Sequence, residues 1–160
     1  MTPFPDPPGF ADWEATIPAS FKRDTIWRTP AYRFGLWLAD LVKADAHVLR
    51  ADRNSRNDAD QLLRAVGSIS SNLSEGYSRS TGPERARYYD YALASARESR
   101  DWYFKARDVL GIEIMEHRIE ILDRIIRILT AIVPREREDK SHRRRRKDRD
   151  NRPPRTDLDR

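Results

Sequence analysis

The sequence contains no cysteine, which excludes disulfide bonds, cysteine-based zinc sites and a thiol nucleophile. It also contains no run of about 18 apolar residues, so no segment is predicted to cross a membrane. The opening residues, MTPFPDPPGF, lack the basic start and apolar stretch of a signal peptide. We therefore expect a cytoplasmic protein that has no membrane contact.

Histidine is scarce, with His47, His117 and His142 as the three examples. Their positions are too dispersed to predict a metal site, and we expect His47 and His117 to lie on the surface. No histidine lies near the serines in sequence, and a serine nucleophile needs an activating base. We therefore predict no catalytic residue, no metal and no cofactor. The Arg137–His142 spacing, which resembles a pair in helical RNases, leaves ribonuclease activity as a minor alternative.

The net charge of +5 is confined to one end of the chain. Residues 135–160 hold 12 lysines and arginines against 7 acidic residues, whereas residues 1–134 hold 19 of each. The high isoelectric point is therefore a property of the C-terminal tail, because the rest of the chain is neutral.

Apolar periodicity predicts an all-α fold, since no strand pattern occurs anywhere. We expect a proline-rich, partly polyproline-like arm over residues 1–29, a helical domain over 30–134, and a disordered tail over 135–160. Trp13, Phe21 and Trp27 indicate that parts of the arm dock. An antiparallel up-down-up-down four-helix bundle is the predicted architecture. Its helices are expected at 30–51, 59–77, 81–110 and 113–133.

Local signals support these boundaries. Thr29 is a candidate N-cap ahead of Pro30, and Thr81 with Glu84 forms a capping box. Gly111 is expected to end the third helix and Pro134 to stop the fourth.

The fourth helix carries an unusually wide apolar face, with two adjacent rows of aliphatic side chains. One antiparallel neighbour does not need so wide a face, so we predict a homo-oligomer. The rows are Met115, Ile119, Leu122, Ile126, Leu129, Val133 and Ile114, Ile121, Ile125, Ile128, Ile132.

The stretch SISSNLSEGY, at residues 68–77, places polar and small residues within a helical pattern. Ser68, Asn72, Glu75 and Arg79 share a helix face with Arg64. The face is either a groove for a ligand or partner, or a packing seam. We favour the seam, in which Asn72 and Glu75 hydrogen-bond to neighbouring helices or a loop and Gly76 helps to end the helix.

Aromatic residues cluster on the third predicted helix and occupy more than one face of it. Some must belong to the core or to a subunit interface, and others are candidates for stacking on bases. The set is Tyr88, Tyr89, Tyr91, Trp102, Tyr103 and Phe104.

The strongest charge signal is Arg143-Arg144-Arg145-Arg146-Lys147. Five adjacent cations can contact several phosphates and release their counterions, which predicts salt-dependent binding to an RNA or DNA backbone. A tail that only increases solubility is the alternative, since acidic residues follow directly.

Residues 61–79, QLLRAVGSISSNLSEGYSR, resemble the characteristic motif of a bacterial four-helix-bundle family, the 23S rRNA intervening-sequence proteins. The resemblance rests on Ser68, Ile69, Asn72, Glu75, Gly76 and Arg79 with their spacing, and it extends over about residues 26–134.

This resemblance implies a compact antiparallel bundle that assembles with itself, as the homopentamers of related proteins do, and it implies no enzymatic activity. Related accessory variability determinants of diversity-generating retroelements bind a reverse transcriptase and its RNA through a basic surface. Their folded part tends to be strongly basic, whereas residues 1–134 are neutral here. We expect a non-enzymatic oligomer that binds nucleic acid, preferably RNA, through its tail; a protein-interaction scaffold or reverse-transcriptase subunit is the alternative.

Overall fold

A computed structural model describes residues 7–138, and this part of the chain is all-α, without a strand. None of its helices combines the length and apolar character that crossing a lipid bilayer requires. The elements are α1 (Phe10–Thr16), the 3₁₀ helices η1 (Phe21–Arg23) and η2 (Thr25–Arg28), α2 (Pro30–Ala51), α3 (Arg56–Tyr77), α4 (Gly82–Lys105), α5 (Arg107–Leu110) and α6 (Ile112–Arg137).

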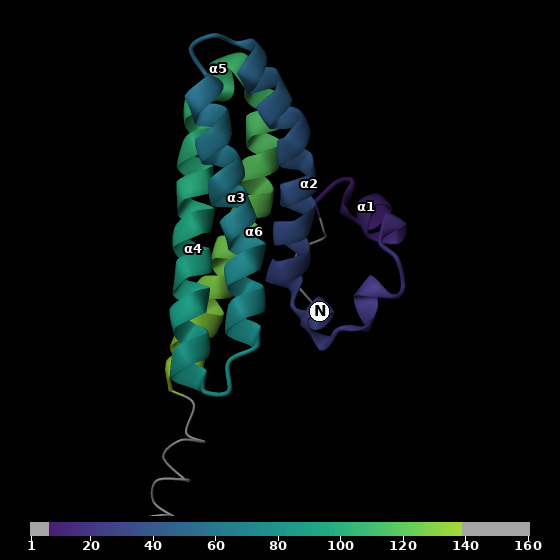
Figure 1. Ribbon diagram of the computed structural model, residues 1–160, viewed down its shortest axis with the longest axis vertical. Coiled ribbons are helices and arrows are strands. Elements are labelled where there is room, and N and C mark those ends of the chain that lie inside the picture. The colour runs from purple at the N-terminus through teal and green to yellow at the C-terminus, as the bar shows by residue number, and fades with distance from the viewer. Residues whose placement is uncertain (1–6, 139–160) are drawn as a thin grey trace, which may run out of the picture.

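The four long helices of residues 7–138, which are α2, α3, α4 and α6, lie side by side and form a helical bundle (Figure 1). α2 packs on α3, α3 on α4 and α4 on α6, while α6 also contacts α2. The short helix α5 and the α2–α3 loop lie at one end, and the α3–α4 turn and the end of α6 lie at the other (Figure 1).

The local signals predicted some helix boundaries correctly but missed one break, because the third helix expected over 81–110 is divided into α4, which ends at Lys105, and the short α5 before Gly111. α2 spans the predicted residues, and Thr81 Oγ1 accepts a hydrogen bond from the Glu84 amide at 3.4 Å at the start of α4. Gly111 adopts a φ of 90°, which favours glycine, and separates α5 from α6. Thr29 precedes α2 without a side-chain capping bond, and α3 begins three residues earlier than predicted.

Pro134 does not stop the last helix, so that prediction is wrong. α6 continues through Pro134 to Arg137. Two ion pairs hold its final turn against α4, from Arg85 Nε to Glu136 Oε2 at 2.8 Å and from Arg137 to Asp90. These contacts between helices outweigh the local cost of a proline in a helix.

The described part of the N-terminal arm is folded, in contrast to the extended arm predicted from its prolines. Phe10 of α1 is 2% exposed, with its ring 4.7 Å from that of Phe34 and 5.4 Å from that of Trp37. Trp13 Nε1 donates a hydrogen bond to Asp40 at 2.9 Å. The predicted docking is therefore confirmed for Trp13 and Trp27, which pack against the core beside α2, whereas Phe21 is 49% exposed.

The wide apolar face of α6 is used mostly within the chain. Ile121, Leu122 and Ile125 are completely buried, because α6 has α4 on one side and α2 on the other. Ile119 and Ile126 are half-buried at the edge of this face. Two neighbours in the same chain thus account for a width that the sequence pattern attributed to an oligomer.

Gly76 allows α3 and α4 to approach closely. A Cβ at this position would lie 2.8 Å from a ring carbon of Tyr89 and 2.9 Å from Cβ of Tyr88, both on α4. Gly76 lies inside α3, which ends at Tyr77. Its importance is therefore the close packing of two helices, rather than the end of one.

We predict that Gly76→Ala lowers the free energy of unfolding by about 1–3 kcal/mol, because overpacking at a closed contact is destabilising. Urea denaturation measures this change. Gly67→Ala is the matched control on the same helix, since a Cβ added there would meet no atom within 4 Å. The control should be stabilised by about 0.5–1 kcal/mol through helix propensity alone. Equal effects of the two substitutions would contradict the close-packing role.

Candidate functional site

Ser68, Asn72 and Glu75 share one face of α3, and Arg79 follows just beyond the end of this helix. Asn72 and Glu75 make different bonds from those predicted. Asn72 Nδ2 donates to the carbonyl of Ser68 at 2.8 Å, and Ser68 Oγ donates to the carbonyl of Arg64 at 2.8 Å. Both bonds remain inside α3. The prediction that Asn72 bonds to a neighbouring helix is therefore wrong, because its side-chain amide donates to a carbonyl on the preceding turn of α3.

Among the described residues Glu75 has no direct bond to another helix, and it pairs with Arg79, which lies just beyond the end of α3. Arg79 completes the connection to α4. Its Nη2 donates to Tyr88 Oη at 2.8 Å, and its guanidinium lies 4.6 Å from the centre of the Tyr88 ring. The anchor between the two helices is therefore the arginine, which holds the glutamate and the tyrosine together.

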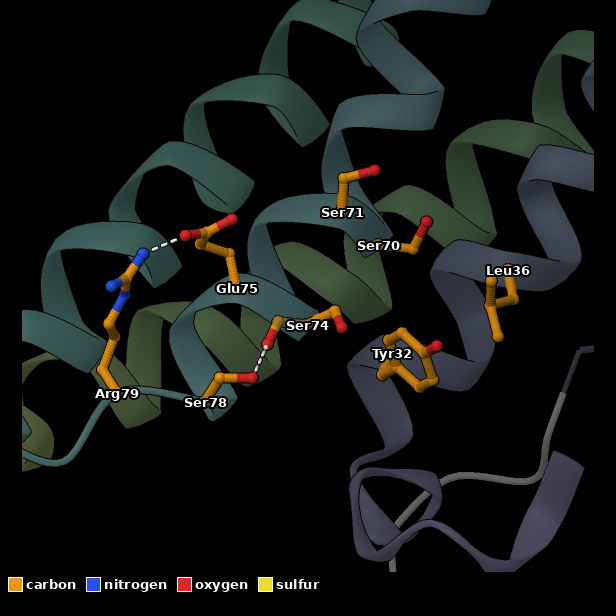
Figure 2. Close-up of a pocket in the computed structure, with 8 residues that line it drawn as sticks. All are labelled: Tyr32, Leu36, Ser70, Ser71, Ser74, Glu75, Ser78 and Arg79. Carbon is orange, nitrogen blue, oxygen red and sulfur yellow. Dashed lines mark hydrogen bonds and ion pairs between the residues drawn. The ribbon is translucent and has the colours of Figure 1, made fainter.

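The other side of the motif borders an open groove between α2 and α3, with a volume of about 550 Å³. Figure 2 shows Ser70 and Ser74 directed toward Tyr32 and Leu36 of α2. Glu75 and Arg79 also line the groove, and in this view they point away from α2 and toward each other. Ser71 and Ser78 donate to carbonyls of their own helix at 3.0 and 3.1 Å. Among residues 7–138, no histidine lines this groove beside its hydroxyl groups.

The aromatic residues of α4 divide between the core and the surface. Tyr89 and Tyr103 are buried, Tyr88 and Trp102 are half-buried, and Tyr91 and Phe104 are exposed. Each of the four that reach the surface has a cation within 6 Å of its ring centre. These pairs are Arg79 with Tyr88, Arg87 with Tyr91, Lys105 with Trp102, and Arg107 with Phe104.

The structure brings the motif and part of this aromatic row onto one surface. Besides the contact between Arg79 and Tyr88, Arg64 at the start of the motif pairs with Glu98 of α4 at 3.4 Å. The two features that the sequence presented separately therefore form the outer α3–α4 face. We define the motif face as Arg64, Ser68, Asn72, Glu75 and Arg79.

A buried ion pair connects three helices, and no pattern in the sequence predicted it. Arg118 of α6 donates from Nε to Asp45 Oδ2 at 2.8 Å and from Nη2 to Oδ1 at 3.1 Å. Tyr103 of α4 donates its hydroxyl to the same Oδ2 at 2.9 Å. One signal was present, because Asp45 lies between Val42 and Leu49 on the apolar face of α2.

Burial raises the pKa of Tyr103 well above its usual value, and the negative charge of Asp45 and its hydrogen bond add to the effect. For Arg118, burial acts to lower the pKa, but the hydrogen bond and charge of Asp45 outweigh it and the net pKa is raised. Both groups therefore remain protonated, and the carboxylate of Asp45 accepts from each.

His117 is half-buried and makes two hydrogen bonds, so its predicted surface position is wrong. Arg118 Nη1 lies 2.6 Å from Nδ1, and the carbonyl of Pro8 lies 3.1 Å from Nε2. Because a guanidinium only donates, Nδ1 accepts and Nε2 carries the proton that is donated to Pro8. His117 thus fastens the arm to α6. His47 is exposed, as predicted.

The predicted phosphate-binding residues 143–147 and His142 lie outside the described residues. Arg137, the other member of the RNase-like pair, is in α6 and pairs with Asp90. Within residues 7–138, no group of three or more histidine, aspartate or glutamate side chains is arranged to hold a metal ion.

A family model for the 23S rRNA-intervening sequence protein matches residues 49–132, which is more than half of the chain. The chain belongs to this family. The match contains the motif face, Gly76 and the aromatic row of α4, and it begins near the end of α2. No curated protein and no solved structure matched the chain. The folded arm and the basic tail lie outside the region that defines the family.

We predict that Arg118→Ala lowers the free energy of unfolding by about 3–5 kcal/mol, because the Asp45 carboxylate would remain buried without its main partner. Chemical denaturation followed by circular dichroism measures the loss. Arg100→Ala provides a matched control, since its pair with Asp123 at 2.9 Å is about half exposed. The control should change stability by less than about 1 kcal/mol. A similarly small effect at Arg118 would show that the buried pair is not needed.

The raised pKa of Tyr103 predicts that the protein loses stability in alkaline solution. Its folded-state pKa is raised above the unfolded value of 10.0, so the stabilisation is complete below pH 10.0 and is lost as the pH rises toward the folded pKa. Denaturation between pH 8 and pH 11 should show a steeper fall for the natural protein than for Tyr103→Phe, which cannot ionise. Parallel curves would exclude this contribution of Tyr103.

Proposed function

We propose that this protein is a non-enzymatic, oligomeric nucleic-acid-binding protein that holds RNA through its basic tail. The observation that carries the proposal is the separation of charge. The whole net charge of +5 lies in residues 135–160, which contain five adjacent cations at 143–147, beside a neutral remainder. Such a segment binds phosphates strongly and reads little sequence by itself.

Membership of the 23S rRNA-intervening sequence protein family is consistent with an RNA partner, because the family is named after an insertion in ribosomal RNA. Several hydroxyl and imidazole groups of the described residues are already hydrogen-bonded within the chain. Ser68, Ser71 and Ser78 donate to carbonyls of their own helix, and His117 is engaged by Arg118 and Pro8. Side chains held in this way are less available as nucleophiles or bases, which supports the non-enzymatic part of the proposal.

The alternative is a protein-interaction scaffold or an accessory subunit of a reverse transcriptase. Two observations make it the second choice. Phe10, the most deeply buried aromatic residue of the described arm, packs on α2 of the same chain instead of remaining available to a partner, although Phe21 is 49% exposed. Moreover, residues 1–134 carry no net charge, whereas the retroelement proteins that the motif resembles tend to be basic there.

We propose further that the four long helices form an antiparallel up-down-up-down bundle, and that copies of it assemble into a homo-oligomer such as a pentamer. Ile119 and Ile126 are half-buried apolar residues at the edges of α6, and their exposed parts are available for contacts between copies. Light scattering coupled to gel filtration gives the number of copies directly, and a single monomer mass would contradict the assembly.

We predict that removal of residues 139–160 weakens RNA binding at least about tenfold and makes it less dependent on salt, by about 0.7 in the logarithmic slope for each lost phosphate contact. The chain should end after Glu138, because Glu136 and Arg137 make ion pairs with α4. Fluorescence anisotropy with a labelled 20-nucleotide single-stranded RNA at several salt concentrations measures both effects.

A full-length control in which residues 143–147 are replaced by glutamine separates charge from length. It should bind as weakly as the truncated chain. Unchanged RNA affinity in either variant would contradict the tail mechanism. Cleavage of the RNA that disappears in His142→Ala would instead establish the nuclease alternative.

A further inference from the structure

We infer that Tyr88 and Tyr91, with Arg79 and Arg87, form a stacking platform that binds unpaired bases of single-stranded RNA next to the start of the tail. We call these four residues the tyrosine platform. The inference rests on the proposed function and extends it, since the tail supplies contacts to phosphates and the platform supplies contacts to bases.

The first observation is an exposed aromatic pair with fixed geometry. Tyr91 is 44% exposed, and its ring centre lies 5.9 Å from that of Tyr88 at an interplanar angle of 89°. Arg87 Nε donates to Tyr91 Oη at 2.9 Å, and Arg79 Nη2 donates to Tyr88 Oη at 2.8 Å. Two rings are thus held in place at the surface, which reduces the entropy lost when a base stacks on them.

The second observation is the state of the neighbouring charges. Glu75 is paired with Arg79, and Glu84 contacts Thr81 at the start of α4. Arg87 is exposed, and among the described residues its hydrogen bond to Tyr91 uses Nε alone. Its terminal nitrogens therefore remain available for a phosphate. Aromatic faces combined with arginine are the usual means of holding single strands.

The third observation is the position of the platform relative to the tail. Asp90, adjacent to Tyr91, pairs with Arg137 in the last turn of α6. The last described residue, Glu138, follows directly. The five residues from Glu138 to Arg143 span at most about 18 Å when fully extended. One short RNA strand can therefore contact the platform and the basic segment together, which favours RNA over a protein as the occupant.

The platform also explains why tyrosine occupies an exposed position that packing does not require. Tyr89, the residue between the two, is 6% exposed and packs against Gly76. Tyr91 makes its ring and hydrogen-bond contacts on the surface, with Tyr88 and Arg87. Packing in the core therefore accounts for Tyr89. The ring of Tyr91, by contrast, remains available for a ligand.

The experiment uses the full chain and compares labelled 12-nucleotide oligoadenosine and oligouridine in fluorescence anisotropy over a salt series. Tyr91→Ala should weaken oligoadenosine binding at least about fivefold, while the salt slope stays unchanged because no phosphate contact is lost. Tyr91→Phe retains the ring but loses the hydrogen bond from Arg87, so its affinity should lie between those of the natural protein and Tyr91→Ala.

Phe104→Ala is the matched control. Phe104 lies on the same helix, is 53% exposed and has Arg107 stacked at 4.3 Å, but it is near the opposite end of α4. It should leave RNA affinity unchanged. Circular dichroism and light scattering check that each variant keeps its helix content and its assembly.

The outcomes separate the platform from the proposed function. If the natural protein binds neither RNA, the proposed function and the platform both fail. If binding depends on the tail but Tyr91→Ala has the affinity of the natural protein, the platform alone is wrong. A Tyr91→Ala variant that keeps its RNA affinity and loses copurification of one defined protein would show that the tyrosines contact a protein instead.

Discussion

The buried pair of Asp45 and Arg118 is the constraint on which the arrangement of helices depends. It joins α2 to α6 by two hydrogen bonds, and Tyr103 adds α4 through a third. Hydrophobic contacts alone tolerate small shifts of one helix along another, whereas a buried carboxylate must meet its partners in one register. His117 extends the network to the arm at Pro8.

Close packing and polar anchoring act together along the α3–α4 contact. Gly76 has no side chain that would collide with Tyr88 and Tyr89, so α3 and α4 can approach closely. This close approach places the guanidinium of Arg79 over the Tyr88 ring. The same contact therefore places Tyr88 and Tyr91 at the surface near the end of α6. The close approach of α3 and α4 thus explains both the glycine in the family motif and the position of the candidate binding surface outside the motif.

The sequence predicted the helices well because apolar periodicity and capping residues are local signals. It failed at Pro134, where ion pairs of Glu136 and Arg137 with α4 extend the helix beyond a residue that normally ends one. It also failed for Asn72, which had two ways to satisfy its amide, and only the folded structure shows that the preceding turn was chosen. The residues of the candidate site could be recognised in the sequence, but their association across two helices could not.

The sequence by itself determined that the chain is helical, which family it belongs to, and that its charge is concentrated in the tail. These properties depend on residue order and composition alone. Only the tertiary structure decided that Asp45, Tyr103 and Arg118 meet, that the arm folds onto α2, and that Arg79 links the motif to the tyrosines of α4. Such contacts join residues far apart in the chain, and no periodicity within one helix specifies which partner a side chain will reach.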